Sequence, residues 1–198
     1  MKIIVIGAAG DVGRAVCAEL GARHEIITVG RSSGDIRADV TDFAAVQNLF
    51  QKTSAFDALI SCAGEVVFAP LTEHTPESLM TGLQQKVMGQ INLVLAGLDV
   101  ITEGGSFTLT SGILDRDPVR KGAGAATANG ALGGFVKSAA IELPRSLRIN
   151  VVSPGLLDVS AETYGEIFPG HSPVASTEVG RAYAKSVEGA ITGQVIIV

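Results

Sequence analysis

Three glycines near the N-terminus have the type and spacing that phosphate binding requires. Gly7, Gly10 and Gly13 follow the segment Lys2–Ile6, which is β-branched from its second residue on, and precede Arg14–Leu20, which has apolar residues at helical spacing. A strand buried on both faces, a glycine turn and a helix are expected in that order. Glycines let the backbone approach a pyrophosphate, and a helix N-terminus offers free N–H groups and a positive dipole end. We predict a phosphate-binding loop; the alternative is a tight turn without a ligand.

A second position suited to nucleotide recognition follows the next predicted strand, Glu25–Val29. The chain continues with Gly30, Arg31, Ser32 and Ser33. An acidic residue here would bind a ribose 2′-OH and favour NAD(H), whereas an arginine and hydroxyls suit a 2′-phosphate. We therefore expect NADP(H) in preference to NAD(H). The alternative is that Arg31 is a solvated loop residue.

The remaining chain supplies the elements that must hold such a site. Thr75 and Pro76 are typical of a helix start, with Thr at the N-cap and Pro in the first turn. The alternation of elements predicts an α/β fold of three layers, doubly wound around a mostly parallel sheet. Residues 156–177 are too long for a simple connection and predict a lid over the site. Further strands are expected at 35–40, 56–60, 106–110, 148–152 and 193–198, and helices at 43–52, 76–98, 124–143 and 178–188.

Composition narrows the class of protein. The 198 residues suit one domain, residues 1–198, and the net charge of −5 comes without any Lys/Arg cluster. We therefore expect no nucleic-acid partner and no membrane surface. Cys17 and Cys62 lack metal or CxxC spacing, which fits a reducing compartment. No signal peptide or membrane-spanning run is evident, so we expect a cytoplasmic protein.

Motifs follow one another in order along nearly the whole chain, at residues 7–13, 39–42, 56–64, 108–112, 133–143, 148–155 and 192–195. Together they resemble the short-chain dehydrogenase/reductase superfamily. The resemblance implies a Rossmann domain with seven parallel strands in the order 3-2-1-4-5-6-7, an NAD(P) cofactor and hydride transfer to or from a carbonyl. It also implies a homodimer or homotetramer built on the helices at 76–98 and 124–143. Gly130, Gly133 and Gly134 weaken the second helix, so we expect another backbone to pack there.

The resemblance also indicates which residues would bind the cofactor. They lie in the glycine loop, after the second and third strands, after the fourth strand, and after the sixth strand. For the small residues after the fourth strand, an ordinary turn is the alternative. The full set is Gly7, Ala9, Gly10, Asp11, Val12, Gly13, Arg31, Ser32, Asp39, Val40, Cys62, Ala63, Gly64, Pro154 and Gly155.

The family's catalytic group is altered in this chain. The family works with Ser, Tyr and Lys, helped by an Asn. Ser111 matches the serine, but Ala125 stands at the tyrosine position and Asn129 at the lysine position, while Lys86 stands where the helper Asn is expected. We expect Lys86 to reach into the space of the missing lysine, so that Ser111, Lys86 and Asn129 form the catalytic group. The alternatives are a solvated Lys86 and a Ser111 that only turns the chain.

Two functions are compatible with this pattern. The first is an NADP(H)-dependent oxidoreductase of atypical mechanism, acting on a small carbonyl or alcohol. A water, Ser111, or a lid residue such as Tyr164 or His171 would then deliver the proton. The second is an NADP(H)-binding redox sensor or scaffold without turnover. Hydride transfer is the chemistry of the cofactor itself, so the loss of Tyr and Lys does not exclude the first.

Overall fold

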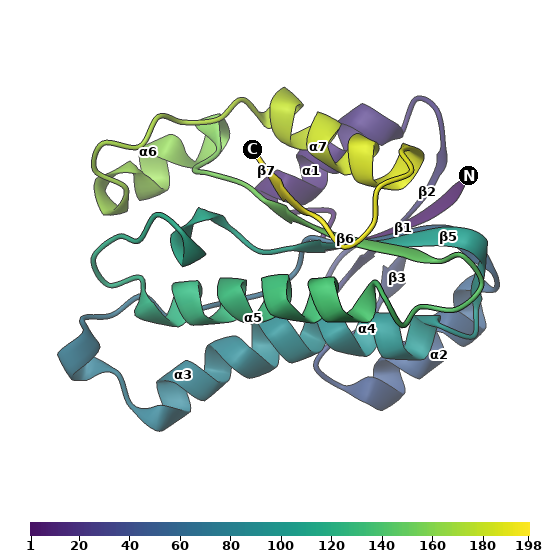
Figure 1. Cartoon of the computed structure of the whole chain (residues 1–198), viewed down its shortest axis with the longest axis horizontal. Coiled ribbons are helices and arrows are strands. Elements are labelled where there is room, and N and C mark those ends of the chain that lie inside the picture. The colour runs from purple at the N-terminus through teal and green to yellow at the C-terminus, as the bar shows by residue number, and fades with distance from the viewer.

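The computed structural model describes all 198 residues as an α/β fold around one sheet (Figure 1). Seven strands run parallel in the order β3-β2-β1-β4-β5-β6-β7, which confirms the predicted fold class and strand order. None of the helices is both long and apolar enough to cross a bilayer. The strands are β1 Lys2–Ile6, β2 Glu25–Gly30, β3 Ile36–Arg37, β4 Phe56–Ser61, β5 Ile101–Thr110, β6 Arg148–Ser153 and β7 Val195–Ile197.

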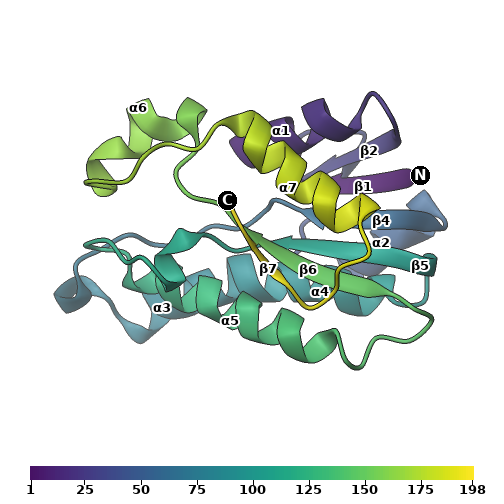
Figure 2. The same ribbon diagram turned by 45° about the horizontal axis from the view of Figure 1, so that its top comes forward.

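Helices cover both faces of the sheet (Figures 1 and 2). α1 (Asp11–Leu20) and α7 (Ser176–Glu188) pack together on one face, and α2 (Phe43–Thr53), α4 (Gly89–Gly97) and α5 (Ala123–Ala139) cover the other. The β-branched residues of β1 serve both layers because side chains of a strand alternate between its faces. Thus Ile4 and Ile6 belong to the core of 21 buried residues, while Ile3 and Val5 belong to the core of 14.

Four elements differ from the sequence prediction by several residues, and one of them is α5, which ends at Ala139 rather than at residue 143. β3 is only Ile36–Arg37, because the flanking carboxylates bond locally: Asp35 accepts from Thr28, and Asp39 accepts from Thr41. β5 begins five residues earlier, at Ile101 rather than residue 106. The predicted helix at 76–98 divides into α3 (Pro76–Gly82), a π-helical segment, Leu83–Met88, and α4.

Residues 156–177 are a folded segment rather than an open loop. They contain α6 (Ala161–Tyr164) between two short 3₁₀ turns, and a bridge between Leu157 and Val174 closes their base. The Ser160 hydroxyl donates to the Asp11 carboxylate over 2.5 Å, which ties this segment to the first turn of α1. The segment therefore lies beside the glycine loop.

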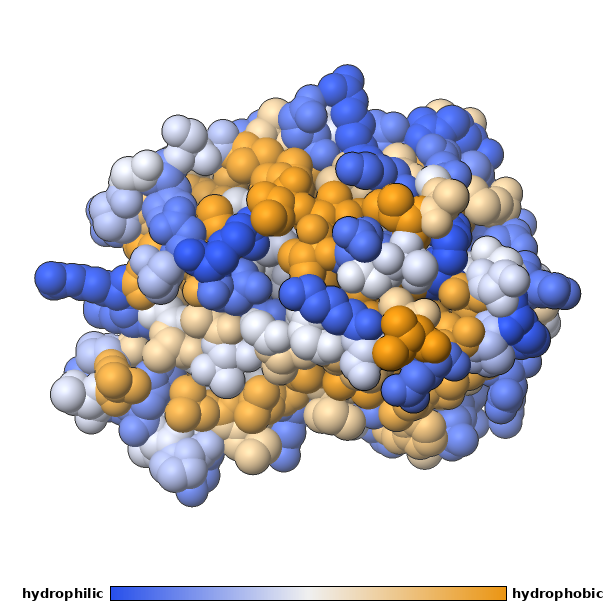
Figure 3. All heavy atoms as spheres, in the orientation of Figure 1, coloured by the Kyte–Doolittle hydropathy of each residue, from blue (hydrophilic) through white to orange (hydrophobic).

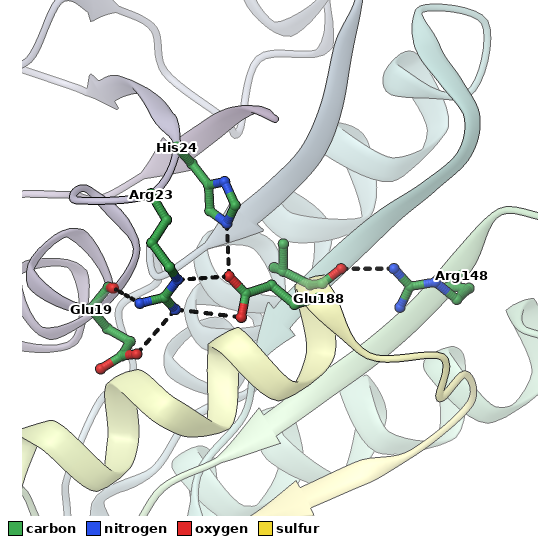
Figure 4. Close-up of polar contacts among 6 residues, drawn as sticks. Glu19, Arg23, His24, Arg148 and Glu188 are labelled. Carbon is green, nitrogen blue, oxygen red and sulfur yellow. Dashed lines mark hydrogen bonds and ion pairs between the residues drawn. The ribbon is translucent and has the colours of Figure 1, made fainter.

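A charged cluster joins the C-terminal ends of α1 and α7, the two helices that cover one face of the sheet (Figure 4). Glu188 at the end of α7 lies 3.0 Å from Arg23 Nε and 2.8 Å from His24 Nε2, and Arg23 also pairs with Glu19. Arg148 on β6 donates to the carbonyl oxygens of Ser186 and Val187, 2.7 and 2.8 Å away. These contacts fix the C-terminal end of α7 on the sheet.

Candidate functional site

The glycine loop leaves the first turn of α1 open. The first hydrogen bond of the helix runs from Arg14 N–H to the Gly10 carbonyl, and no side chain caps the N-terminus. The amides of residues 11–13 consequently have no partner in the protein. A Cβ on Gly13 would collide with the carbonyl oxygen of Gly7, so the turn needs glycine there. Free amides at a helix N-terminus are suited to an anion.

Two cavities meet at the carboxyl ends of β1 and β4, where the strand order reverses. A cavity of about 250 Å³ extends from Gly7 and Gly10 to the loops after β2 and β3. A second, of about 300 Å³, lies over the ends of β4 and β5. Both are lined by Cys62, Ala63 and Gly64. Ligands of doubly wound folds bind in this crevice.

The structure distributes the expected cofactor residues unevenly over this region. The second cavity includes Val12, Pro154 and Gly155, Ala9 borders a neighbouring hollow, and Asp11, Gly13 and Ser32 line none of the three. The 250 Å³ cavity brings together Gly7, Gly10, Arg31, Asp39, Val40, Cys62, Ala63 and Gly64.

Arg31, which lines the 250 Å³ cavity, forms an ion pair with another residue of that cavity. Its guanidinium lies 3.2 Å from the carboxylate of Glu65, and both side chains are largely exposed. Asp39, on the same cavity, accepts hydrogen bonds from the hydroxyl and amide of Thr41, which together lower the pKa of its carboxyl group. An exposed ion pair of this kind contributes little to stability, so a phosphate could replace Glu65 at small cost.

The second cavity brings Ser111, Lys86 and Asn129 together. Lys86 Nζ donates to the Ser111 carbonyl oxygen over 2.9 Å and to Asn129 Oδ1 over 2.8 Å. Ala125, one helical turn before Asn129, also lines the cavity. The Lys86 side chain points toward Ser111 and Asn129 in the cavity, as expected, and not into bulk solvent. The Ser111 hydroxyl makes only a long contact, 3.4 Å, to the Val152 carbonyl.

The π-helical segment sets the position of Lys86. A π turn leaves backbone groups outside the normal helical ladder, and the buried Gln90 side chain bonds the Lys86 carbonyl over 3.1 Å. Gln90 also bonds both backbone groups of Thr110, over 2.9 and 2.8 Å. On the other side, Gly64 has φ +148°, and a Cβ there would lie 2.6 to 2.9 Å from Lys86. Gln90 therefore anchors the backbone of Lys86, and Gly64 leaves the room that its side chain needs.

Burial changes the acidity of Lys86. Loss of solvent around the ammonium lowers the pKa of Lys86 to about 8, and the Asp115 carboxylate acts in the opposite direction. The same effect raises the pKa of the Cys62 thiol to about 12, so Cys62 is a neutral lining residue. Lys86 can thus both hold and release a proton near neutral pH.

Several residues of the site were missed by sequence reasoning. Gln90 follows Lys86 by one helical turn, and that spacing was a usable signal. No sequence pattern indicated the apolar wall formed by Val66, Phe68, Ile113 and Leu114. From the segment 156–177, Tyr164 lines the cavity, whereas His171 lies 3.7 Å from Asp117 and does not.

Comparison with known proteins agrees with this architecture. The family model of enoyl-(acyl carrier protein) reductase matches residues 8–198. A 3-oxoacyl-[acyl-carrier-protein] reductase of Mus musculus is 29% identical over 98% of this chain and 94% of its own length.

Solved structures are similar over the whole chain. The protein lin1944 from Listeria innocua has a TM-score of 0.98 and 47% identity, covering 100% of this chain and 99% of its own. A small-chain dehydrogenase in complex with NADPH has a TM-score of 0.87 and 25% identity, covering 100% and 96%. The chain therefore belongs to the enoyl-(acyl carrier protein) reductase family of the short-chain dehydrogenases/reductases.

Proposed function

We propose that this protein is an NADP(H)-dependent oxidoreductase that interconverts a small carbonyl compound and its alcohol. The observation that carries the proposal is the pair of adjacent cavities that share a wall, one reaching Gly10 at the open N-terminus of α1 and the other lined by Ser111, Lys86 and Asn129. One cavity suits a dinucleotide, and the other brings a polar group beside it.

The residues present fit a dinucleotide. The free amides of residues 11–13 would hold its pyrophosphate. Because Gly13 has no Cβ, it packs directly against the Gly7 carbonyl. Arg31 would bind a 2′-phosphate after leaving Glu65, and the wall of Cys62, Ala63 and Gly64 would face the adenosine. The similar small-chain dehydrogenase in complex with NADPH supports this choice of cofactor.

The site carries Ala125 and Asn129 where the family resemblance implies a tyrosine and a lysine. This difference is the reason for a second candidate function. When bound, the dinucleotide supplies or accepts the hydride. The chain must handle the proton, and Ala125 carries no group that can do so. An NADP(H)-binding sensor or scaffold without turnover is therefore the second candidate, favoured specifically by Ala125 at the cavity wall.

Fluorescence titration of NADPH and NADH, followed by cofactor absorbance with a panel of carbonyls and alcohols, tests both functions. We expect NADPH to bind more tightly than NADH and to be oxidised by at least one carbonyl. Binding without turnover on any compound would favour the sensor. The absence of binding would contradict both.

Arg31→Ala isolates the cofactor preference. A charge-assisted contact to phosphate contributes about 1.5–3 kcal/mol, so we expect NADPH affinity to fall about tenfold or more. NADH affinity should stay within about twofold, since NADH lacks the phosphate. Equal NADPH affinity in the variant would contradict the role of Arg31.

We also propose that the protein is a homo-oligomer, most simply a C₂ dimer, assembled through α5. In the single chain, Cβ atoms added at Gly130 or Gly134 would meet nothing within 4 Å, while Gly133 faces Val195. Much of the surface over α5 is white to pale orange in Figure 3, although some blue atoms cross it, because small residues make up much of the helix. The expected close packing at Gly130 and Gly134 would thus come from a partner helix.

A further inference from the structure

Lys86 is the one charged side chain that lines the 300 Å³ cavity. The rest of the lining is neutral, and about half of it is apolar: of 21 residues, 12 are hydrophobic. No carboxylate lines the cavity to neutralise the ammonium; Asp115 acts on it from outside the lining. Such a cavity suits a ligand with an apolar body and one oxygen that carries, or gains, negative charge.

The Lys86 ammonium has a hydrogen to give to such an oxygen. An ammonium has three N–H donors, and the Ser111 carbonyl and Asn129 Oδ1 accept from it. The protein provides no acceptor for the third N–H. Since Lys86 is only partly buried and lines the cavity, a ligand oxygen can take that position.

The hydrogen bond from Lys86 also fixes the orientation of the Asn129 side-chain amide. Lysine has no acceptor, so the amide must present its oxygen to Nζ and its nitrogen elsewhere. Asn129 Nδ2 makes no hydrogen bond within the protein, although the residue is only 2% exposed and lines the cavity. Two donors, Lys86 Nζ and Asn129 Nδ2, are therefore available at one place, beside the space that Ala125 leaves open.

We propose that Lys86 is the proton donor for carbonyl reduction and that Asn129 Nδ2 binds the same oxygen, in an apolar ketone or aldehyde that carries no charge of its own. This inference rests on the proposed function and deepens it. It assigns to Lys86 the proton delivery that a water, Ser111 or a lid residue would otherwise perform.

The proton and electron balance of the step is complete. A bound reduced dinucleotide would supply the hydride for the new C–H bond at the carbonyl carbon and would itself be oxidised. The π electrons of the C=O bond move to the oxygen, which takes a proton from Lys86 Nζ and becomes the alcohol. Lys86 is left as a neutral amine and regains its proton from water. Removing a positioned acid of this kind slows reactions by about 10²- to 10⁴-fold.

The groups that face Lys86 determine how the site responds to pH. Asp115, after β5, is the charged group that acts on it, while Cys62 and Tyr164 are the other titratable residues of the cavity wall. Glu65, next to Gly64, is paired with Arg31. The residues of α5 that contact the cavity, Ala125 and Asn129, carry no charge.

The test uses a probe that needs neither cofactor nor turnover. Phenylacetate has an apolar body and a carboxylate that resembles the charged oxygen, and phenylacetamide has the same shape without the charge. We expect calorimetry on the full chain at about pH 6 to show at least about tenfold tighter binding of phenylacetate. The preference should disappear at about pH 10, where Lys86 is neutral.

Variants separate the donor pair from general effects of charge. Lys86→Met and the nearly isosteric Asn129→Asp should both abolish the preference, whereas Lys52→Met, on the exposed side of α2, should keep it. Circular dichroism and NADPH titration establish that each variant is folded. Equal binding of the two probes, no binding of either, or a preference that survives in Lys86→Met would overturn the inference. Failure of NADPH to bind would overturn the proposed function instead.

Discussion

At the scale of single residues, the site depends on a glycine that makes room for a lysine. Gly64 holds φ +148°, and its missing side chain is what lets Lys86 pass. A residue with a Cβ at such a φ costs about 1–3 kcal/mol, and here it would also push against Lys86.

Gly64→Ala should consequently lower both stability and probe binding. We expect a loss of about 1–3 kcal/mol in the free energy of unfolding, measured in urea, and a loss of the preference for phenylacetate. Gly165→Ala is the matched control, because Gly165 has a helical φ of −55° and a Cβ there meets nothing within 4 Å. That change should leave the preference intact and should not lower the free energy of unfolding. Normal probe binding in Gly64→Ala would show that Lys86 does not need the space.

At the scale of elements, the π-helical segment Leu83–Met88 connects the site to the sheet. Gln90 makes the connection, with hydrogen bonds to the Lys86 carbonyl and to both backbone groups of Thr110. A side chain of the same size without polar groups would leave these buried groups unpaired.

Gln90→Leu should therefore destabilise the protein by about 3 kcal/mol, since a buried unpaired polar group costs about 1–3 kcal/mol. It should also weaken the preference for phenylacetate, because the segment that carries Lys86 loses its anchor. Gln84→Leu, at an exposed position of the same segment, is the control and should change stability by less than about 0.5 kcal/mol. Similar free energies of unfolding in urea for the two variants would argue against the anchoring role of Gln90.

The charged cluster between α1 and α7 gives a pH-dependent prediction. Hydrogen bonds from Arg23 and then His24 lower the pKa of the Glu188 carboxyl group. A carboxyl group with a lowered pKa stabilises the fold above its unfolded pKa, about 4.3, and this contribution is lost as pH falls through the folded value. Glu188→Gln should lower Tm at neutral pH and should have a smaller effect at about pH 3, where the carboxyl group is closer to its protonated form. Glu162→Gln, an exposed residue of α6, should not change Tm at either pH. A pH-independent effect of Glu188→Gln would mean that its charge is not involved.

Elements that form because of neighbouring residues in the chain could be predicted from the sequence. The start of α3 follows from Thr75, whose side chain accepts from Ser78 N–H, and β1 follows from its β-branched residues. The direction of Lys86 could be inferred from the paired exchange of Lys and Asn. The π turn could not, because it depends on Gln90 reaching across to β5. The short β3 likewise reflects competition between side-chain and ladder hydrogen bonds, which residue pattern alone does not resolve.

At the scale of the whole molecule, one sheet places the anion-binding turn and the polar cavity side by side. The exposed small residues of α5 lie on the same layer, so assembly through α5 would hold the helix that carries Asn129. We predict a dimeric mass at micromolar concentration by sedimentation. Gly134→Arg should give a monomer with unchanged circular dichroism, because it adds bulk and charge to a surface that is open in the single chain. A monomeric parent protein would contradict the dimer.

Titration of Lys86 itself tests most directly whether this side chain is held in the cavity. In protein labelled with ¹⁵N-lysine, the resonance lost in Lys86→Met identifies the side chain, and its shift is followed against pH. We expect a pKa of about 8 for Lys86, because the ammonium is withdrawn from solvent between Ser111 and Asn129. Phenylacetate should raise that pKa, since a bound carboxylate favours the charged lysine. A value near that of free lysine, about 10.4, unaffected by the probe, would place Lys86 in solvent and contradict the account.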